Sequence, residues 1–231
     1  MSAICRSLTH VPKGRHRVDL SLYLVANRPS FRNEELFISK IMESVKGGAT
    51  CVQFRDHESE FKDTLRTASR LKKLLRGKAP LLVNTLQSIE LAQRINAEGV
   101  YLEKPFSFSA ARWLLGVKSI IGIPVKTMQD VFDVNRTDEI DHISVKVSAS
   151  KRTCPKNDQL WEPQGLKFVR AISSHRIVAI GGLTLDNAEP IYRLLRSDDG
   201  IAMAGGLMDQ EDPCATAQKI KALRKKVNGD L

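Results

Sequence analysis

Short apolar runs alternate with longer amphipathic stretches from residue 20 to the end of the chain. The runs are rich in Val, Ile and Leu, and the stretches repeat apolar positions three or four residues apart, so the pattern predicts strands followed by helices. The predicted strands cover residues 20–26, 51–55, 80–84, 99–102, 119–125, 141–147, 177–180 and 200–204. The predicted helices cover residues 33–46, 59–76, 88–96, 109–115, 127–134 and 163–172, a segment that starts near residue 184, and residues 212–227.

This alternation also predicts how the strands are arranged. Apolar runs joined by helix-length segments are typical of parallel strands that are buried on both faces. Strand–helix repeats without a linker predict one domain at residues 20–231, a single (β/α)8 TIM barrel. The alternative is a doubly wound open sheet, which would usually carry its phosphate-binding glycines after an early strand, whereas paired glycines come last in this chain.

Glycine pairs follow the last two predicted strands. Gly181 and Gly182 end the seventh strand, and Gly205 and Gly206 come directly after Ala204 at the end of the eighth. Glycines let the backbone approach a ligand, and free N–H groups at the start of a helix favour an anion. Because the loops after strands seven and eight of a TIM barrel commonly bind phosphate, we expect these five residues to surround one. The alternative is a pair of left-handed turns that only connect strand to helix.

The charge of the chain favours a small anionic ligand. The net charge is +10, but the basic residues are spread over helical stretches and only 6% of the residues are aromatic. Nucleic-acid binding would need basic residues gathered on one face with aromatic residues between them, so nucleic acid is not expected as a partner. A small phosphorylated ligand accounts for part of the positive field.

Cysteine spacing and hydropathy indicate the compartment. The four cysteines (Cys5, Cys51, Cys154 and Cys214) stand far apart without a C-x-x-C pair. This spacing argues against a zinc site and a disulfide framework and fits the cytoplasm. No apolar run approaches the length of a membrane span, so no membrane partner is expected. Residues 1–19 are a basic N-terminal extension, which could be a targeting arm, a tail or a cover for the bottom of the barrel. The oligomeric state stays open.

Polar residues at the predicted strand ends are the candidates for chemistry, because TIM-barrel sites lie at the C-terminal ends of the strands. Gln53 and Arg55 are two residues apart and point to the same side of their strand. Arg55 can hold a phosphate with two hydrogen bonds or form an ion pair at the rim. Asn84 can position a ring nitrogen or a phosphate, or it can cap the next helix. Lys126 follows the fifth strand directly.

The loop after the sixth strand adds further cations. Lys151, Arg152 and Lys156 lie within the nine residues 148–156. Such a loop can close over an anion, and the alternative is a solvated surface loop.

Seven segments together resemble one enzyme superfamily. They are LYLV at residues 22–25, GGATCVQFRD at 47–56, PLLVN at 80–84, AEGVYL at 97–102, IIGI at 120–123, VAIGGL at 178–183 and DGIA at 199–202. The set resembles thiamine-phosphate synthase and, equally, the TenI-type thiazole tautomerases, over about residues 20–223. The resemblance implies a small TIM barrel that holds a thiazole phosphate at the last two strand–helix loops. In the synthase, a pyrimidine pyrophosphate and magnesium complete the site.

The resemblance also implies roles for single residues. Gln53 and Arg55 match the Gln-x-Arg that grips the pyrophosphate of the synthase, and Asn84 matches its asparagine. Thr153 keeps one threonine of its Thr-x-Thr-Lys loop, near Lys151.

Several positions depart from the synthase pattern. His57 stands in place of a lysine, and Thr85 in place of a metal-binding aspartate. Residues 103–106 replace the second metal aspartate, and Pro124 replaces a serine of the fifth strand. Without these carboxylates magnesium has little to hold it besides the phosphates of the substrate, so we expect no metal cofactor. Magnesium-dependent synthase activity should then be weak or absent, unless cations such as Lys151 replace the metal.

The TenI branch offers another reaction, a proton shift on the thiazole that needs no pyrophosphate. That branch uses a histidine in the fifth-strand motif, where this chain has Lys126. A lysine whose pKa is lowered by burial or by neighbouring cations can act as an acid and base. We therefore predict Lys126 and Thr153 as catalytic residues, and Gln53, Arg55, Asn84 and Lys151 as substrate-binding residues. The alternatives are a catalytically inactive phosphate-ligand-binding or regulatory protein, and a barrel with another phosphorylated substrate.

Overall fold

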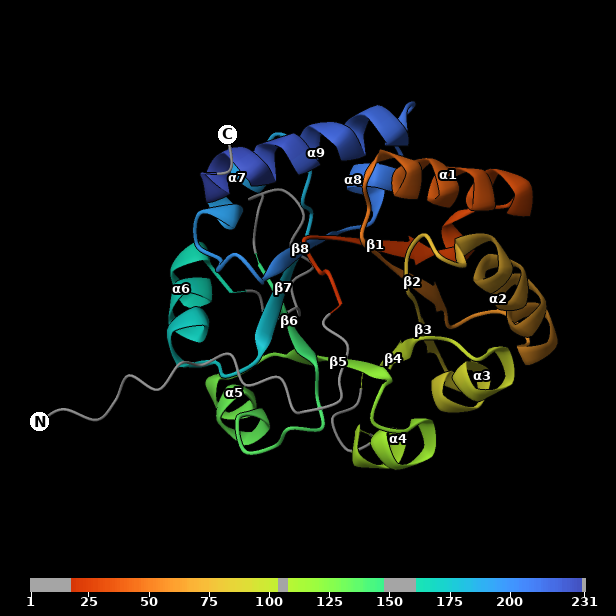
Figure 1. Cartoon of the computed structure of the whole chain (residues 1–231), viewed down its shortest axis with the longest axis horizontal. Helices are drawn as coiled ribbons and strands as arrows, with labels where there is room; N and C mark the ends of the chain where they lie inside the picture. Colours follow the sequence, from red (N-terminus) through yellow and green to blue (C-terminus); the bar gives the residue numbers. More distant parts are fainter. Residues whose placement is uncertain (1–17, 104–107, 148–160, 230–231) are drawn as a thin grey trace, which may run out of the picture.

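The computed structural model describes residues 18–103, 108–147 and 161–229. In this part of the chain, eight parallel strands close into a barrel in sequence order, and helices form a ring around them (Figure 1). The predicted TIM barrel is confirmed, and the alternative of an open, doubly wound sheet is excluded. The extension up to residue 17 and the loop residues Lys151 and Thr153 lie outside the described residues.

The strands match the apolar runs closely. They are β1 (Leu22–Asn27), β2 (Cys51–Asp56), β3 (Leu81–Thr85), β4 (Gly99–Tyr101), β5 (Ile120–Val125), β6 (His142–Lys146), β7 (Arg176–Ile180) and β8 (Gly200–Met203). β1 begins at Leu22, two residues later than predicted, because Leu22 is the first residue that pairs with β8, opposite Ile201. Leu20 precedes the strand but is buried in the interior of the barrel.

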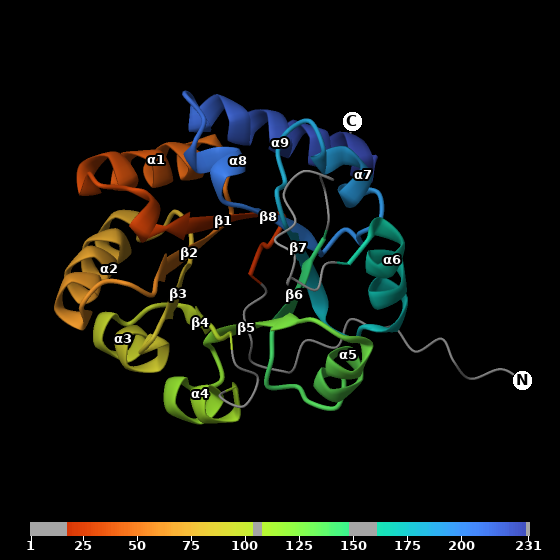
Figure 2. The same cartoon turned by 180° about the vertical axis from the view of Figure 1, so that it is seen from behind.

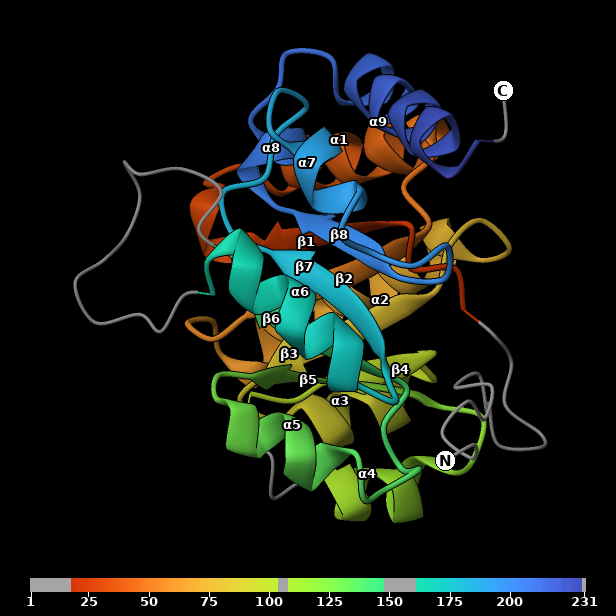
Figure 3. The same cartoon turned by 90° about the vertical axis from the view of Figure 1, so that its left-hand side faces the viewer.

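The helices cover the outside of the barrel, as the views from behind and from the side show (Figures 2 and 3). They are α1 (Glu34–Gly47), α2 (Phe61–Leu75), α3 (Ser88–Ile95), α4 (Phe108–Leu115), α5 (Met128–Val134), α6 (Pro163–Ile172), α7 (Ala188–Tyr192), α8 (Gly205–Met208) and α9 (Pro213–Asn228), with a short 3-10 turn η1 (Arg28–Ser30). Among the residues that the structure describes, no helix is long and apolar enough to cross a membrane.

Two helices differ from the prediction for local reasons. α2 begins at Phe61 rather than at residue 59, because the carboxylate of Asp56 accepts hydrogen bonds from the backbone N–H groups of Glu58 and Ser59 and turns the chain there. α7 begins only at Ala188, because the Asn187 side chain bonds to the backbone of the preceding loop. The last repeat carries two helices, α8 and α9, instead of one.

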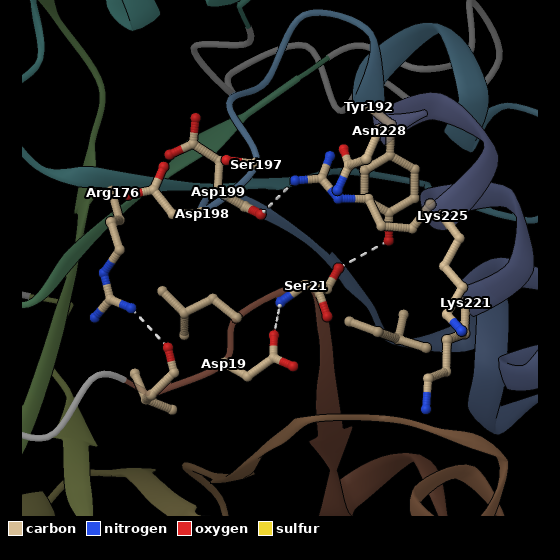
Figure 4. A pocket seen from close by; sticks show the side chains of 14 residues that line it. Asp19, Ser21, Arg176, Tyr192, Ser197, Asp198, Asp199, Lys221, Lys225 and Asn228 are labelled. Atoms are coloured by element: carbon tan, nitrogen blue, oxygen red, sulfur yellow. Dashed lines mark hydrogen bonds between the residues drawn. The ribbon is translucent and has the colours of Figure 1, made fainter. Parts of the chain in front are cut away.

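The N-terminal end of the barrel holds a pocket of about 460 Å³, where the starts of β1, β7 and β8 meet α9 (Figure 4). Contacts among its lining residues fasten α9 and α7 to the strands. The Tyr192 hydroxyl donates to the carbonyl of Ser21 at 2.8 Å, and Nη2 of Arg224 donates to the carbonyl of Asp199 at 3.0 Å. The Arg224 guanidinium also lies 4.6 Å from the centre of the Tyr192 ring. This end of a TIM barrel serves stability, and the contacts fit that role.

Candidate functional site

A cavity of about 470 Å³ opens at the C-terminal end of the barrel. It brings together four of the residues predicted from the sequence: Gln53, Arg55, Asn84 and Lys126. The other lining residues are Val25, Tyr101, Glu103, Pro124, Val125, Ser144, Lys146 and Ile180. A second cavity of about 420 Å³ borders it at Asn84, Tyr101 and Glu103 and includes His57.

The floor of the cavity is a chain of buried hydrogen bonds. The Tyr23 hydroxyl donates to Oε1 of Gln53 at 2.8 Å, and Nε2 of Gln53 donates to Oδ1 of Asn84 at 3.2 Å. Nδ2 of Asn84 donates to the carbonyl of Tyr101 at 3.0 Å, which fixes the orientation of the amide. Burial raises the pKa of Tyr23 well above its usual value, so its hydroxyl stays protonated and remains a donor. The floor is therefore polar but uncharged.

Asn84 belongs to this floor and does not cap the following helix. The N-cap residue of α3 is Gln87, and no side chain caps the helix there. Of the two roles that the sequence left open for Asn84, the structure excludes capping of α3, and positioning a ligand stays a prediction.

Tyr101 and Ser144 form a second polar contact on the cavity wall. Their hydroxyl groups are hydrogen-bonded to each other across the barrel. Burial raises the pKa of Tyr101, so this hydroxyl also keeps its proton at neutral pH. Sequence reasoning missed both residues, although each lies on a predicted strand. Their contact joins residues 43 positions apart, and only the closure of the barrel reveals it.

One rim of the cavity carries a cluster of charged residues at the ends of β2 and β4. Nη2 of Arg55 lies 3.5 Å from Oε1 of Glu103, and Nε2 of His57 lies 3.6 Å from the same oxygen. Nη1 of Arg55 donates to Oδ1 of Asn27 at 2.9 Å. The structure thus shows the rim ion pair that the sequence offered as the alternative role of Arg55. Glu103 was not among the predicted site residues.

The contact of His57 with Asn84 indicates which ring nitrogen of His57 carries a hydrogen. Nε2 of His57 lies 3.2 Å from Oδ1 of Asn84, and that oxygen is an acceptor because Nδ2 of the same amide donates to Tyr101. Nε2 must therefore carry a hydrogen, in the neutral or the charged ring. The hydrogen also faces the carboxylate of Glu103.

Lys126 and Lys146 lie on the other side of the cavity, at the ends of β5 and β6. The Asp130 carboxylate accepts hydrogen bonds from the backbone N–H groups of Lys126 and Thr127 at the start of α5, which fixes the backbone under the Lys126 side chain. Both lysines are largely exposed, and Lys126 forms no ion pair with any residue in the described ranges. Since β2 and β5 are three strands apart in the closed barrel, cations face the cavity from two sides.

One glycine in each of the loops after β7 and β8 is required by close backbone packing. Gly181 has φ of +134°, and a Cβ atom there would lie 2.3 Å from the carbonyl oxygen of Val147. A Cβ atom on Gly206 would lie 2.1 Å from the carbonyl oxygen of Leu183. Both loops therefore depend on glycine without any ligand, so a phosphate seat at these positions stays a prediction.

One detail of the glycine region differs from the expectation. The sequence predicts a helix that starts near residue 184, shortly after the glycine pair, whereas α7 begins at Ala188. The lining of the C-terminal cavity reaches Ile180 but does not include Gly181, Gly182, Ala204, Gly205 or Gly206.

The described residues around the cavity offer few of the oxygen ligands that magnesium would need. In the described part of the chain, no group of three or more His, Cys, Asp and Glu residues could hold a metal ion. Thr85 is buried where the resemblance would place a carboxylate, and Glu103 faces Arg55 and His57. Magnesium prefers several oxygen ligands in an octahedral arrangement, and this donor set does not supply them.

A protein family, curated relatives and a solved structure that match most of this chain carry related names. The family described as thiamine monophosphate synthase matches residues 22–207. Thiamine-phosphate synthase of Albidiferax ferrireducens is 34% identical over 208 residues, covering 88% of this chain and 91% of that protein. The enzyme of the same name from Clostridium acetobutylicum is 32% identical over 207 residues, covering 88% of this chain and 91% of that protein. The structure of thiamine phosphate pyrophosphorylase from Pyrococcus furiosus superposes with a TM-score of 0.77 at 22% identity, covering 91% of this chain and 98% of that one.

Proposed function

Because the chain belongs to the thiamine monophosphate synthase family, we propose that its C-terminal cavity binds a small thiazole-type phosphate. The observation that carries the proposal is the distribution of charge around the cavity. Cationic side chains of Arg55, Lys126 and Lys146 surround a floor of neutral hydrogen-bonding groups. A polar heteroaromatic ring with an anionic substituent matches such a lining.

The reaction that these residues support best is a proton shift on the thiazole ring. In this step a base takes a proton from one carbon of the thiazole compound and an acid returns a proton to another carbon, so the composition of the ligand does not change. Lys126 lines the cavity and can exchange a proton with a bound ring through its Nζ atom. The Asn84 amide in the floor and the Tyr101 hydroxyl on the wall of the cavity can orient the ring. Thr153 and Lys151 keep their predicted roles as part of this proposal.

The coupling of a pyrimidine pyrophosphate to the thiazole is the less favoured reaction for this chain. That reaction needs stabilisation of a pyrophosphate leaving group, which magnesium would normally provide. Among the described residues no group of carboxylates and imidazoles could hold magnesium, and the Arg55 guanidinium already faces a carboxylate. The names of the relatives point toward the coupling reaction, which makes its direct assay necessary.

A non-catalytic role is the second candidate. Its supporting observation is the exposure of Lys126, whose side chain can extend into solvent instead of over the cavity. In that case the protein would bind the phosphorylated ligand without converting it, for storage or regulation.

The test compares wild type with Lys126→Ala and with a control, Lys118→Ala. Lys118 is an exposed lysine just before β5, at the opposite end of the strand from Lys126. Binding of thiazole phosphate is measured by calorimetry, and both reactions are assayed with ample magnesium. We expect wild type and Lys118→Ala to bind thiazole phosphate and to catalyse the tautomerisation, and Lys126→Ala to bind it without turnover.

Each other result has a defined meaning. Robust thiamine phosphate formation by wild type would overturn the preference for tautomerisation. Tautomerisation that survives Lys126→Ala would remove Lys126 from the mechanism. Binding without either reaction would establish the non-catalytic role, and no binding of thiazole phosphate would refute the proposed ligand.

A further inference from the structure

We propose that Glu103 is an internal competitor for anions at the Arg55 side of the cavity, and that it makes the site selective for singly phosphorylated ligands over diphosphates. The proposal deepens the proposed function, since it concerns which anions the same cavity accepts. The conformation that the structure shows has the carboxylate of Glu103 in contact with both nearby basic side chains.

The geometry places one oxygen atom between two basic groups. Oε1 of Glu103 is 3.5 Å from Nη2 of Arg55 and 3.6 Å from Nε2 of His57. The guanidinium is held from its other side by Asn27, and the imidazole is held by Asn84. The two basic groups are thus oriented by neutral residues and converge on one position, which the carboxylate occupies. Any other anion that binds Arg55 there must displace Glu103 or share the position with it.

Glu103 also lies at the boundary between the two cavities of this face, because it lines both of them. The end of β4 just before it is fixed by the backbone hydrogen bond from Leu102 to the carbonyl of Gly122. A ligand long enough to extend from the central cavity toward His57 therefore passes the Glu103 side chain. A diphosphate bound at Arg55 carries more negative charge near the carboxylate than a phosphate does.

The energetics indicate that Glu103 weakens the binding of other anions to Arg55 without excluding them. The side chains of Arg55 and Glu103 are 38% and 48% exposed, and exposed ion pairs of this kind contribute little to stability. The carboxylate can therefore be displaced. Its negative charge nevertheless remains within a few ångströms of the incoming anion and cancels part of the attraction of Arg55. The penalty grows with the charge of the ligand, so it is larger for a diphosphate than for a phosphate monoester.

The test measures binding of inorganic pyrophosphate and of inorganic phosphate by calorimetry at low salt. The variant Glu103→Gln keeps the shape of the side chain and removes its charge. The control is Glu58→Gln, because Glu58 lies next to His57, is exposed, and contacts neither Arg55 nor His57 through an ion pair. We expect Glu103→Gln to bind pyrophosphate about tenfold more tightly than wild type, with a smaller gain for phosphate. Glu58→Gln should behave like wild type.

A double variant tests whether the gain in pyrophosphate affinity depends on Arg55. In Glu103→Gln combined with Arg55→Gln, the added pyrophosphate affinity should disappear, because the gain depends on the released guanidinium. Equal affinities of wild type and Glu103→Gln would overturn the proposal. An equal gain in Glu58→Gln, or a gain that survives loss of Arg55, would overturn it as well, since either result would reflect the overall charge of the protein. Glu103→Ser serves as a second charge-removing variant if the glutamine variant does not fold.

The outcome is separable from that of the proposed function. If Glu103→Gln gains pyrophosphate affinity while no variant binds thiazole phosphate, the inference holds and the proposed ligand is wrong. If thiazole phosphate binds but Glu103→Gln gains nothing for pyrophosphate, the proposed ligand holds and the inference is wrong.

Discussion

His142 should make the barrel sensitive to acid, and replacing it with leucine should remove most of that sensitivity. The side chain is fully buried at the start of β6, where its ring lies against Gly122 and 5.7 Å from the ring of Tyr23. Within the described residues, neither ring nitrogen has a hydrogen-bond partner. Burial, with smaller contributions from the positive charges of Arg176 and His175, lowers the pKa of His142 from 6.5 to about 3.

The direction of the effect follows from where the proton binds. The unfolded chain takes up a proton on this histidine below about pH 6.5, whereas the folded protein does so only near pH 3. The stability that depends on neutral His142 is therefore fully present above pH 6.5 and is lost progressively as the pH falls toward 3. One pKa unit corresponds to about 1.4 kcal/mol, so the loss reaches about 1.4 kcal/mol at pH 5.5 and about 2.7 kcal/mol at pH 4.5.

Urea unfolding at pH 7.5, 5.5 and 4.5 measures this loss. Between pH 7.5 and 4.5, wild type should lose about 2.7 kcal/mol more unfolding free energy than His142→Leu. The control is Ser144→Ala, which alters the same face of β6 without changing a group that titrates in this range. It should shift the free energy equally at all three pH values. His175, whose pKa burial also lowers, leaves some acid sensitivity in every variant.

Two results would refute the reasoning about His142. Parallel loss of stability in wild type and His142→Leu would show that this histidine does not set the acid response. If the leucine variant does not fold, NMR titration of wild type gives the same decision. A His142 ring resonance that titrates near pH 6.5 in the folded protein would contradict the buried, neutral state.

Two further predictions concern the glycine loops and the metal. Gly206→Ala should lower the unfolding free energy by about 1–3 kcal/mol in urea unfolding, because the new Cβ meets a backbone carbonyl. Gly205→Ala should lower it clearly less, because its Cβ meets only the exposed Asp209 carboxylate, which can rotate away. Equal losses in the two variants would contradict this account. Magnesium without ligand should leave the midpoint of thermal unfolding unchanged, because the described residues supply no adequate donor set. A clear rise in the midpoint would show that the site holds the ion after all.

The sequence predicted the architecture well because parallel strands and amphipathic helices have different hydrophobic periods. The rule that strand ends meet at one face of a barrel then brought Gln53, Arg55, Asn84 and Lys126 to one cavity. What it could not predict are contacts that depend on how strands face each other. Glu103 follows a three-residue strand and meets Arg55 only because β2 and β4 lie on either side of β3 in the barrel.

The glycine pairs illustrate a second limit of sequence reasoning. A glycine that approaches a ligand and a glycine that approaches another stretch of backbone look the same in a sequence. Gly181 and Gly206 are already accounted for by the carbonyl groups of Val147 and Leu183. The sequence also could not predict the late start of α7. The Asn187 side chain forms hydrogen bonds with the backbone of Gly182 and Thr184, and this contact is not visible in the sequence.

The pocket at the N-terminal end of the barrel also makes the chain a candidate for circular permutation. Val18 and Asn228, near the two ends of the described chain, line this one pocket, so a short linker could join them. Strand pairing joins β8 to β1, and the Tyr192 hydroxyl bonds to Ser21 directly before β1. Both contacts can remain when the chain ends are linked. New termini fit at Gly77, an exposed turn before β3 with no atom within 4 Å of a Cβ placed there. The order of the strands in the sequence would change, while the cavity at the other end of the barrel would keep all its residues.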